Sequence, residues 1–448
     1  MIRRKAKFEA YTSTFIKFSF KKLTCFMVCC LSIPFVFTRL VWFLTANDTT
    51  FAGCTPKFNN KKFNLTKDLL KLLPTKDFEQ LVDLNNFGYI MDQPACTDNI
   101  TALMLVHTAP THFNKRLRIR ETWAQPADLQ GTPLRLLFLL GAVADQTLQQ
   151  NLLLENERFA DMVQGNFVDD YQNMTYKHTM AFKWFIYNCA QAHILIKLDD
   201  DVFVNIYQLL EYAMEEGQDD NKKHLNSTKT SIKSDDAMQS SHTSLKSAKQ
   251  LFHHPQCLLC CSEFMPRSPI RRTFRSKWHL RVRDYPGYYF PQYCSGYAVI
   301  YSPDVLIRLY LALQSTEYFW IDDVFITGKL AQRLKIQHTL LTPYVLSKDT
   351  YEDLQQGKVH LTEMQFIFTW PYITEEQIRK LWLQKELTSL VTNFLLKFEK
   401  NTQINCNRHS IKSPLFNLIE YNFIYAVFIL VYNFISFVCW FTRTKTLQ

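Results

Sequence analysis

Three consecutive aspartates, Asp199 to Asp201, carry the strongest chemical signal in the chain. They follow Ile194–Leu198, a stretch that is apolar except for Lys197 and that suits a strand buried on both faces. Adjacent carboxylates repel one another, and a divalent cation would offset that repulsion. Carboxylate oxygens suit Mg2+ or Mn2+, ions that usually also contact a substrate phosphate. Ligands of open α/β sheets bind beyond the carboxyl ends of the strands, so the triplet predicts a metal and phosphate site there, with a solvated acidic turn as the alternative.

A second pair of carboxylates, Asp322 and Asp323, interrupts the apolar segment Tyr318–Phe325. Burial of two acidic groups among apolar side chains is costly unless each group has a partner or a chemical task. The pair is therefore the second candidate for a reactive site.

Further motifs accompany these two acidic sites. In chain order they are Arg116–Trp123, Phe167–Lys177, Lys197–Asp201, Lys277–Trp278, Tyr285–Pro286, Tyr293–Gly296 and Asp322–Ala331. Together they resemble the β-1,3-glycosyltransferase family (glycosyltransferase family 31), which includes β-1,3-galactosyltransferases and β-1,3-N-acetylglucosaminyltransferases. The resemblance extends from about Cys96 to Ala331, and it rests on the order of the motifs rather than on one of them.

The resemblance implies roles for both acidic sites. The triplet is similar to the DxD-type site of the family, in which Asp201, assisted through water by Asp199 and flanked by Asp200, would hold Mn2+ against the diphosphate of a UDP-sugar. The family's Glu-Asp-Val motif supplies the proposed general base from its Asp, which corresponds to Asp323. Asp322 takes the place of the Glu. An inverting transfer needs such a base to take the proton of the acceptor hydroxyl.

Other side chains are expected to contact the substrates. Arg116 and Arg120 lie four residues apart and share one helical face, so together with Lys197 they are candidates for contacts with the donor. The candidates for contacts with the acceptor sugar are Trp278, Tyr285 and Gly296. A solvated basic face and an aromatic core are the alternative interpretations.

The order of apolar and amphipathic segments predicts the fold class. Buried-strand patterns at residues 102–106, 134–141, 165–169 and 194–198 alternate with helical patterns at 114–123, 144–159 and 171–189. This alternation is typical of an α/β domain with a mostly parallel sheet flanked by helices. A GT-A type sheet, as the resemblance implies, has the same layout.

Composition changes along the chain suggest its division into segments. Residues 1–22 are basic, and residues 23–46 are apolar and long enough to span a bilayer, which predicts a cytosolic tail and an uncleaved N-terminal transmembrane anchor. A cleaved signal peptide is the alternative. Residues 47–95 are expected to form a stem, and residues 96–400 the GT-A domain. Residues 218–250 are polar and suggest a disordered insertion, whereas residues 416–441 are apolar enough for a second span.

This topology predicts a single-pass type II protein of the Golgi membrane with its catalytic domain in the lumen. Asn-x-Ser/Thr triplets for glycosylation occur at Asn47, Asn64, Asn99, Asn173 and Asn226. A lumen would also favour disulfides among the cysteines, with a zinc site at Cys257, Cys260 and Cys261 as the less favoured interpretation.

The 448 residues carry a net charge of +10 without a nucleic-acid-binding motif, so a nucleic-acid partner is not expected. Two functions remain. The first is Mn2+-dependent transfer of galactose or N-acetylglucosamine from a UDP-sugar to the 3-hydroxyl of a glycan on a glycoprotein or glycolipid. The second is a catalytically degenerate relative that binds or scaffolds without turnover. Asp322, and Val299 where the family usually has Tyr, favour the second function, whereas the intact triplet and Asp323 favour the first.

Overall fold

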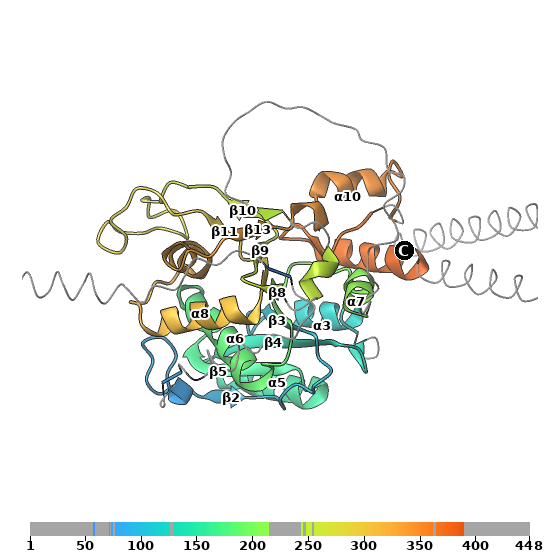
Figure 1. Cartoon of the computed structure of the whole chain (residues 1–448). Helices are drawn as coiled ribbons and strands as arrows, with labels where there is room; N and C mark the ends of the chain where they lie inside the picture. The colour runs from blue at the N-terminus through green and yellow to red at the C-terminus, as the bar shows by residue number, and fades with distance from the viewer. Residues whose placement is uncertain are drawn as a thin grey trace, which may run out of the picture. The chain divides into compact units, whose positions relative to one another are not determined.

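A computed structural model describes part of the chain (Figure 1). The described residues are 57–58, 71, 73–74, 77–125, 129–214, 243–244, 248–252, 255–361 and 364–388. Within them, no helix has both the length and the apolar character needed to cross a membrane. The predicted anchor at 23–46 and the apolar segment at 416–441 lie outside the described residues. Every element named below belongs to the compact unit that ends at Arg379.

A nine-stranded sheet organises this unit. In spatial order its strands are β2 (Tyr89–Met91), β5 (Met162–Val168), β4 (Leu134–Ala142), β3 (Ala102–His107), β6 (Ile194–Asp199), β12 (Ala298–Tyr301), β9 (Leu259–Cys261), β13 (His338–Leu340) and β7 (Thr243–Ser244). Strands β5, β4, β3 and β6 run parallel, whereas β2 and β12 are antiparallel to their neighbours. The prediction of a mostly parallel sheet is confirmed.

Helices connect the parallel strands, as the sequence pattern predicts. The main ones are α3 (Phe113–Glu121), α5 (Gln146–Phe159), α6 (Met174–Asn188), α7 (Ile206–Met214), α8 (Pro303–Gln314) and α10 (Lys348–Gln355). The helix expected from Tyr171 begins instead with a 3-10 turn, Tyr171–Asn173, where the Asp170 carboxylate accepts a hydrogen bond from the Gln172 amide at 2.7 Å. After β12 and α8 the chain enters a π-helical stretch, η5 (Asp323–Leu330), a rare geometry that is frequent at functional sites.

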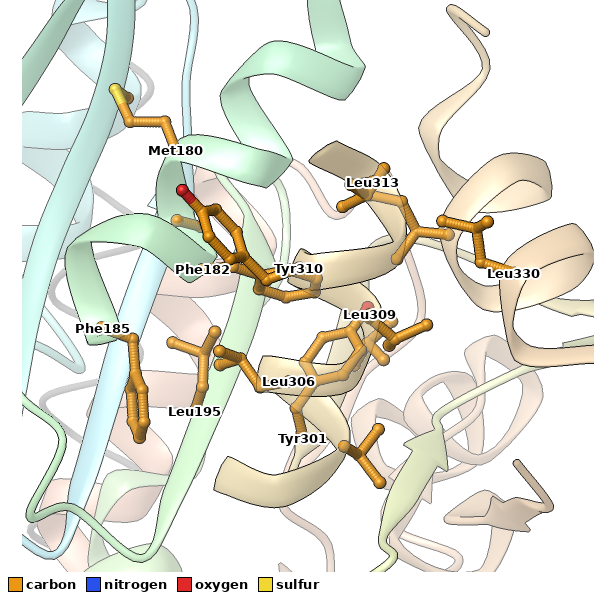
Figure 2. Close-up of a cluster of buried hydrophobic side chains, with 14 of the residues drawn as sticks. Met180, Phe182, Phe185, Leu195, Tyr301, Leu306, Leu309, Tyr310, Leu313 and Leu330 are labelled. Atoms are coloured by element: carbon orange, nitrogen blue, oxygen red, sulfur yellow. The ribbon is translucent and has the colours of Figure 1, made fainter. Parts of the chain in front are cut away.

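The core lies between α6 and the elements packed against it (Figure 1). α6 contacts β3 and β4, and α8 packs on α6. Figure 2 shows Phe182 and Phe185 of α6 beside Leu306 and Leu309 of α8, all buried in one apolar cluster. This packing fixes α6 and α8 against the sheet, and it therefore fixes the strands and loops that carry the acidic residues.

The expected stem is shorter than predicted. Residues 77–91 belong to the folded unit, because β2 pairs with β5 and because Leu81, Val82 and Phe87 are buried in the core. The fully buried Asp77 accepts hydrogen bonds from Tyr187 and Tyr310, both at 2.8 Å. These long-range contacts could not be read from the mixed Lys, Asn and Leu composition of the segment.

The expected disordered insertion at 218–250 is also shorter at its C-terminal end. Thr243–Ser244 form β7, which pairs in parallel with β13, and a 3-10 turn, Ala248–Phe252, follows. Leu251 and Phe252 are buried, which anchors this end of the segment. Residues 215–242 lie outside the described part of the chain.

Two disulfides have both cysteines within the described residues, and Cys257 is disulfide-bonded as well, which supports the predicted preference for disulfides over zinc. Cys96 is bonded to Cys189, and Cys261 is bonded to Cys294. Cys260 is a buried free thiol. Among the described residues, the only group of three or more metal-ligating side chains with ligand atoms within 4.8 Å of one another is Cys261, Cys294 and His338. Two of its three members are in a disulfide, so it lacks the thiolates that zinc requires.

Candidate active site

Strand pairing brings Asp199 to the end of the sheet. Asp199 is the last residue of β6, and the register places it opposite His107, the last residue of β3. On the other side, the Asp199 amide donates to the Tyr297 carbonyl at 2.9 Å, just before β12 begins. The triplet therefore lies at the carboxyl edge of the parallel strands, as predicted.

Asp200 lines a small cavity together with Asp201, but its carboxylate is engaged by the scaffold. Its carboxylate accepts hydrogen bonds from Thr108 Oγ1 at 2.7 Å, His112 Nδ1 at 2.7 Å and Lys115 Nζ at 2.8 Å. Burial alone would raise its pKa, but these donors outweigh burial and lower the pKa to about 2. Asp200 was expected among the metal ligands. Because its oxygens are already engaged, it instead ties β6 to the loop between β3 and α3.

Asp199 and Asp201 remain as the oxygen donors that a cation could use. Asp199 keeps 36% of its side chain exposed and forms one ion pair, with Lys197 Nζ at 2.6 Å. Within the described part of the chain, no hydrogen bond or ion pair engages the Asp201 carboxylate, which lines a cavity of about 350 Å³ together with Lys115 and Tyr372. Burial raises the pKa of both aspartates, and Asp199 adds to the rise for Asp201. The Asp201 carboxylate beside this cavity and the partly exposed Asp199 carboxylate two residues earlier offer oxygens that fit a hard cation, which would also take oxygens from a substrate.

Gly296 joins the aspartate triplet to the second acidic pair. Lys197 Nζ donates to the Gly296 carbonyl oxygen, and the Gly296 amide donates to Asp323 Oδ2 at 3.1 Å. A Cβ atom at position 296 would collide with the Asp323 carboxylate, so only glycine allows this approach. Burial alone would lower the pKa of Lys197, but Asp199, Asp322 and Asp323 outweigh burial and raise it. Lys197 is therefore a permanent cation between the two acidic sites.

The two carboxylates of the second pair have different environments. Asp322 is buried, and its Oδ2 lies 2.9 Å from Nδ1 of His178, whose Nε2 lies 3.1 Å from the Tyr301 hydroxyl. Burial would raise the pKa of Asp322, but His178 outweighs it and the pKa is lowered. Burial and the neighbouring Asp322 charge raise the pKa of Asp323 well above its ordinary value. The pair therefore holds one ionised carboxylate, Asp322, beside one strong proton acceptor, Asp323.

The family model for galactosyltransferases matches residues 114–253 and 225–342, which together make up slightly more than half of the chain. The chain belongs to the galactosyltransferase family. This confirms the resemblance to β-1,3-glycosyltransferases and, with it, the prediction that the chain is a hexosyltransferase.

Relatives with galactosyltransferase names match between about half and two thirds of this chain. Beta-1,3-galactosyltransferase 1 of Homo sapiens and that of Mus musculus are each 26% identical over 303 residues, which cover 67% of this chain and 79% of the relative. Beta-1,3-galactosyltransferase 5 of Pan paniscus is 28% identical over 235 residues, which cover 52% of this chain and 65% of the relative. Among solved structures, the galactosyltransferase LgtC in complex with donor and acceptor sugar analogs superposes with a TM-score of 0.29 at 8% identity, over 62% of this chain and 94% of that chain.

Arg116 and Arg120 do not lie free for donor contacts in this galactosyltransferase domain. Arg116 is fully buried and donates from Nε and Nη2 to Glu155 at 2.8 and 2.6 Å. Arg120 donates to Glu155 at 2.8 Å and to both carboxylate oxygens of Asp161. The sequence interpretation as donor ligands is at odds with these contacts, because buried acidic partners take up both guanidinium groups and join α3 to α5.

The three residues expected to contact the acceptor sugar lie in different surroundings. Trp278 is 40% exposed, and its indole N–H donates to the Tyr171 hydroxyl at 2.8 Å. Tyr285 is half-buried and packs against Phe290 and Phe319. Trp278 is thus a partly exposed ring with Lys277 Nζ 4.5 Å from its centroid, Tyr285 lines a separate cavity, and Gly296 acts through its backbone.

Of the five glycosylation triplets, two lie within the described residues. Asn99 is exposed, as a glycan would require. The amide nitrogen of Asn173 donates to the Val168 carbonyl at 2.9 Å, so the atom that would carry a glycan is already engaged. Asn47, Asn64 and Asn226 lie outside the described residues.

Sequence reasoning missed several residues of the site. His178 and Tyr301 support Asp322, while His112 and Lys115 hold Asp200. Their partners are 85 to 144 residues away along the chain, so no local pattern marks them. The available signal was that His178 is a polar residue within α6, the helix between β5 and β6 in the chain.

Proposed function

We propose that the chain is an inverting β-1,3-hexosyltransferase that transfers galactose or N-acetylglucosamine from a UDP-sugar to the 3-hydroxyl of a glycan acceptor, with Mn2+ as its cofactor. The observation that carries the proposal is the chain of hydrogen bonds Asp199–Lys197–Gly296–Asp323. It joins the carboxylates proposed to bind the cation to the carboxylate proposed to accept the proton. Family membership and the names of the relatives, both β-1,3-galactosyltransferases, support the sugar and the linkage. We also propose a GT-A type domain.

Asp201 and Asp199 are the residues that would hold the metal ion. A bound Mn2+ would neutralise the negative charge that develops on the UDP leaving group. Lys197 orients Asp199 through its 2.6 Å ion pair and opposes the rise that burial causes in the pKa of Asp199. Asp200 contributes indirectly, because its three hydrogen bonds hold the backbone of the triplet in place.

Asp323 is the residue that would act as general base. It takes the proton of the acceptor 3-hydroxyl while that oxygen attacks the anomeric carbon from the face opposite UDP. Its raised pKa makes it a stronger proton acceptor than an ordinary aspartate. Asp322 keeps its negative charge through His178, and the Gly296 amide fixes Asp323 Oδ2 in position.

The contacts of Val299 and Asp322 weaken the two arguments for a catalytically degenerate relative. Val299 is buried within β12, where it pairs with Lys197 of β6 and Cys261 of β9. The strand pairing is therefore intact with Val in place of Tyr. Asp322, although shorter than Glu, still has a buried partner in His178. Neither departure removes a group from the proposed chemistry. We further propose a type II Golgi membrane location with a luminal domain, from the charge and hydropathy of residues 1–46.

The test is transfer by the full-length chain in detergent. UDP release and acceptor glycosylation are measured for UDP-galactose, UDP-N-acetylglucosamine and UDP-N-acetylgalactosamine, with Mn2+ and with EDTA. The proposal expects one of the first two donors to be used, EDTA and Asp201→Asn to abolish transfer, and Asp323→Asn to abolish transfer while Mn2+-dependent UDP binding persists. Asp353→Asn, which changes an exposed aspartate of α10, is the control. UDP binding without transfer across a broad glycan screen would instead establish the degenerate alternative.

A further inference from the structure

The segment between β10 (Phe264–Met265) and β11 (Tyr293–Cys294), residues 266–292, is here called the basic loop. Its seven basic residues are Arg267, Arg271, Arg272, Arg275, Lys277, Arg281 and Arg283, and Asp284 is its single acidic residue. Neither the metal site nor the general base uses any of these cations. Seven cations and one acidic residue give the loop a net positive charge, which favours the binding of a negatively charged ligand.

The backbone of the basic loop is held in a fixed conformation. The Cys261–Cys294 disulfide and the pairing of β10 with β11 close its base. Across the loop, the Ile270 amide donates to the Tyr288 carbonyl at 3.0 Å. One arginine, Arg272, donates to the carbonyl oxygens of Leu280, Tyr285 and Gly287 at 3.0, 2.7 and 2.6 Å. Arg272 thus organises the loop, and the other cations are presented from a defined scaffold.

Several of these cations line one large cavity. It has a volume of about 1550 Å³, and its lining includes Arg267, Arg281, Arg283 and Lys329 together with Tyr289 and Trp320. Its acidic lining residues are Asp284 and Glu317. Asp284 is shared between Arg281 at 2.9 Å and Arg283 at 3.4 Å, and the two arginine side chains remain 60% and 70% exposed. Two guanidinium groups on one carboxylate leave a net positive charge and free N–H donors facing the cavity.

The cavity lies beside the segment that carries the proposed general base. Trp320, in its wall, precedes Asp322 by two residues, and its ring lies 5.9 Å from that of Tyr171. Phe319, in the same wall, packs at 6.1 Å against Phe325 of η5, the stretch that begins with Asp323. By contrast, Asp201 lines the separate 350 Å³ cavity, so the phosphates of the donor have their own site. The large cavity is therefore on the acceptor side.

We infer that the acceptor glycan carries a negatively charged sugar, either a uronic acid or a sulfated residue, which Arg281 and Arg283 bind in the large cavity. This inference rests on the proposed function and names the class of its acceptor. Arginine suits the role because its planar fork donates two parallel hydrogen bonds to a carboxylate or sulfate. Exposed aromatic rings such as Tyr289 offer flat faces to the neighbouring sugars, and Arg267 already lies over that ring at 5.0 Å.

The test compares matched acceptors with the full-length chain. One pair is N-acetyllactosamine with and without 6-O-sulfate, and the other is a glucuronic-acid-containing tetrasaccharide with and without reduction of its carboxyl groups. Transfer and acceptor binding are both measured, the latter by calorimetry with Mn2+ and UDP present. The variants are Arg281→Gln with Arg283→Gln, and the control is Lys348→Gln with Lys358→Gln, which removes two exposed cations that also have acidic neighbours.

The inference expects the charged member of at least one pair to be preferred, and the arginine double variant to lose about tenfold or more in kcat/KM for it, as for the loss of a charge-assisted contact. The same variant should change kcat/KM for the neutral acceptor by less than about twofold. The lysine control should change kcat/KM for neither acceptor. Which pair responds separates sulfate from carboxylate.

Equal use of charged and neutral acceptors, or equal loss for both, would overturn the inference while leaving the proposed function intact. If no acceptor is glycosylated, the proposed function fails. Calorimetry then decides the inference by itself. Charge-selective acceptor binding that the arginine variant abolishes would support the inference, and binding without charge selectivity would overturn it.

Discussion

The imidazole of His178 and the carboxylate of Asp322 form a buried hydrogen bond of 2.9 Å between helix α6 and the residue before η5. An ionised carboxylate can only accept, so Nδ1 of His178 carries the proton of this bond. Burial lowers the pKa of His178 despite the nearby Asp322, which favours a neutral ring whose Nε2 accepts from the Tyr301 hydroxyl at 3.1 Å. The chain Tyr301–His178–Asp322 therefore fixes the tautomer of the histidine and the orientation of the residue beside the proposed base.

Replacement of His178 tests this relay. In His178→Ala, Asp322 loses its buried donor, and we expect a stability loss of about 3 kcal/mol or more together with a fall in kcat of at least tenfold. KM for the donor should change little, because His178 touches neither the triplet nor its cavity. His178→Gln, which keeps a donor, should recover much of both losses. The measurements are thermal unfolding and steady-state transfer, with His360→Ala, at an exposed position, as control. Equal damage from Ala and Gln would contradict a hydrogen-bonding role.

Gly296 offers a second, sterically defined test. In Gly296→Ala the added methyl group must displace the Asp323 carboxylate, since the new Cβ would overlap it. We expect transfer to fall at least about a hundredfold, because a displacement of about 1 Å at a reacting group has an effect of that size. Mn2+-dependent UDP binding should persist, since Asp199 and Asp201 are untouched.

The matched control for Gly296 is Gly88→Ala, where the added methyl group meets no atom within 4 Å. Its transfer rate should equal that of the wild type. Normal transfer by Gly296→Ala would mean that Asp323 is not the base, or that its position is not set by residue 296.

The two halves of the site differ in how far the sequence could reveal them. Asp199 and Asp323 follow from strand pattern and motif order, because the position of a carboxylate at a strand end is a local property. The sequestration of Asp200 is not local, since Thr108 and Lys115 approach it from 92 and 85 residues earlier in the chain. Three adjacent aspartates cannot be distinguished in a sequence. The fold shows that the middle one is hydrogen-bonded by protein side chains.

The arginine pair of α3 illustrates the same limit. A spacing of four residues correctly placed Arg116 and Arg120 on one helical face, but it could not say what that face meets. The partner is Glu155 on α5, a residue with no motif around it. Substrate contact and a buried ion pair predict the same sequence pattern, so contacts in the folded chain were needed to choose between them.

Glu155→Gln separates those two roles. The buried Arg116 guanidinium would lose the carboxylate that offsets its charge, and Arg120 would keep only Asp161, so we expect a loss in unfolding free energy of about 3–5 kcal/mol. The fraction that remains folded should bind Mn2+-UDP with an unchanged Kd, because no contact in this network reaches Asp199 or Asp201. Denaturant unfolding and UDP titration are the measurements, and Glu352→Gln on the exposed face of α10 is the control. A weaker Kd with normal stability would restore the arginines as donor ligands.

Asp200 predicts a pH dependence of stability with a definite sign. Its folded-state pKa is about 2, below the ordinary value of 3.8, so its contribution is complete above 3.8 and is lost as pH falls from 3.8 toward 2. A shift of this size corresponds to about 2 kcal/mol. Asp200→Asn should therefore be less stable than the wild type by about that amount at pH 6–7, and the difference should shrink as pH falls below 4. Chemical unfolding from pH 2.5 to 7 with EDTA present measures it, with Asp353→Asn as an exposed control. A difference that stays constant across this range would show that packing, and not the charge of Asp200, binds the triplet to the β3–α3 loop.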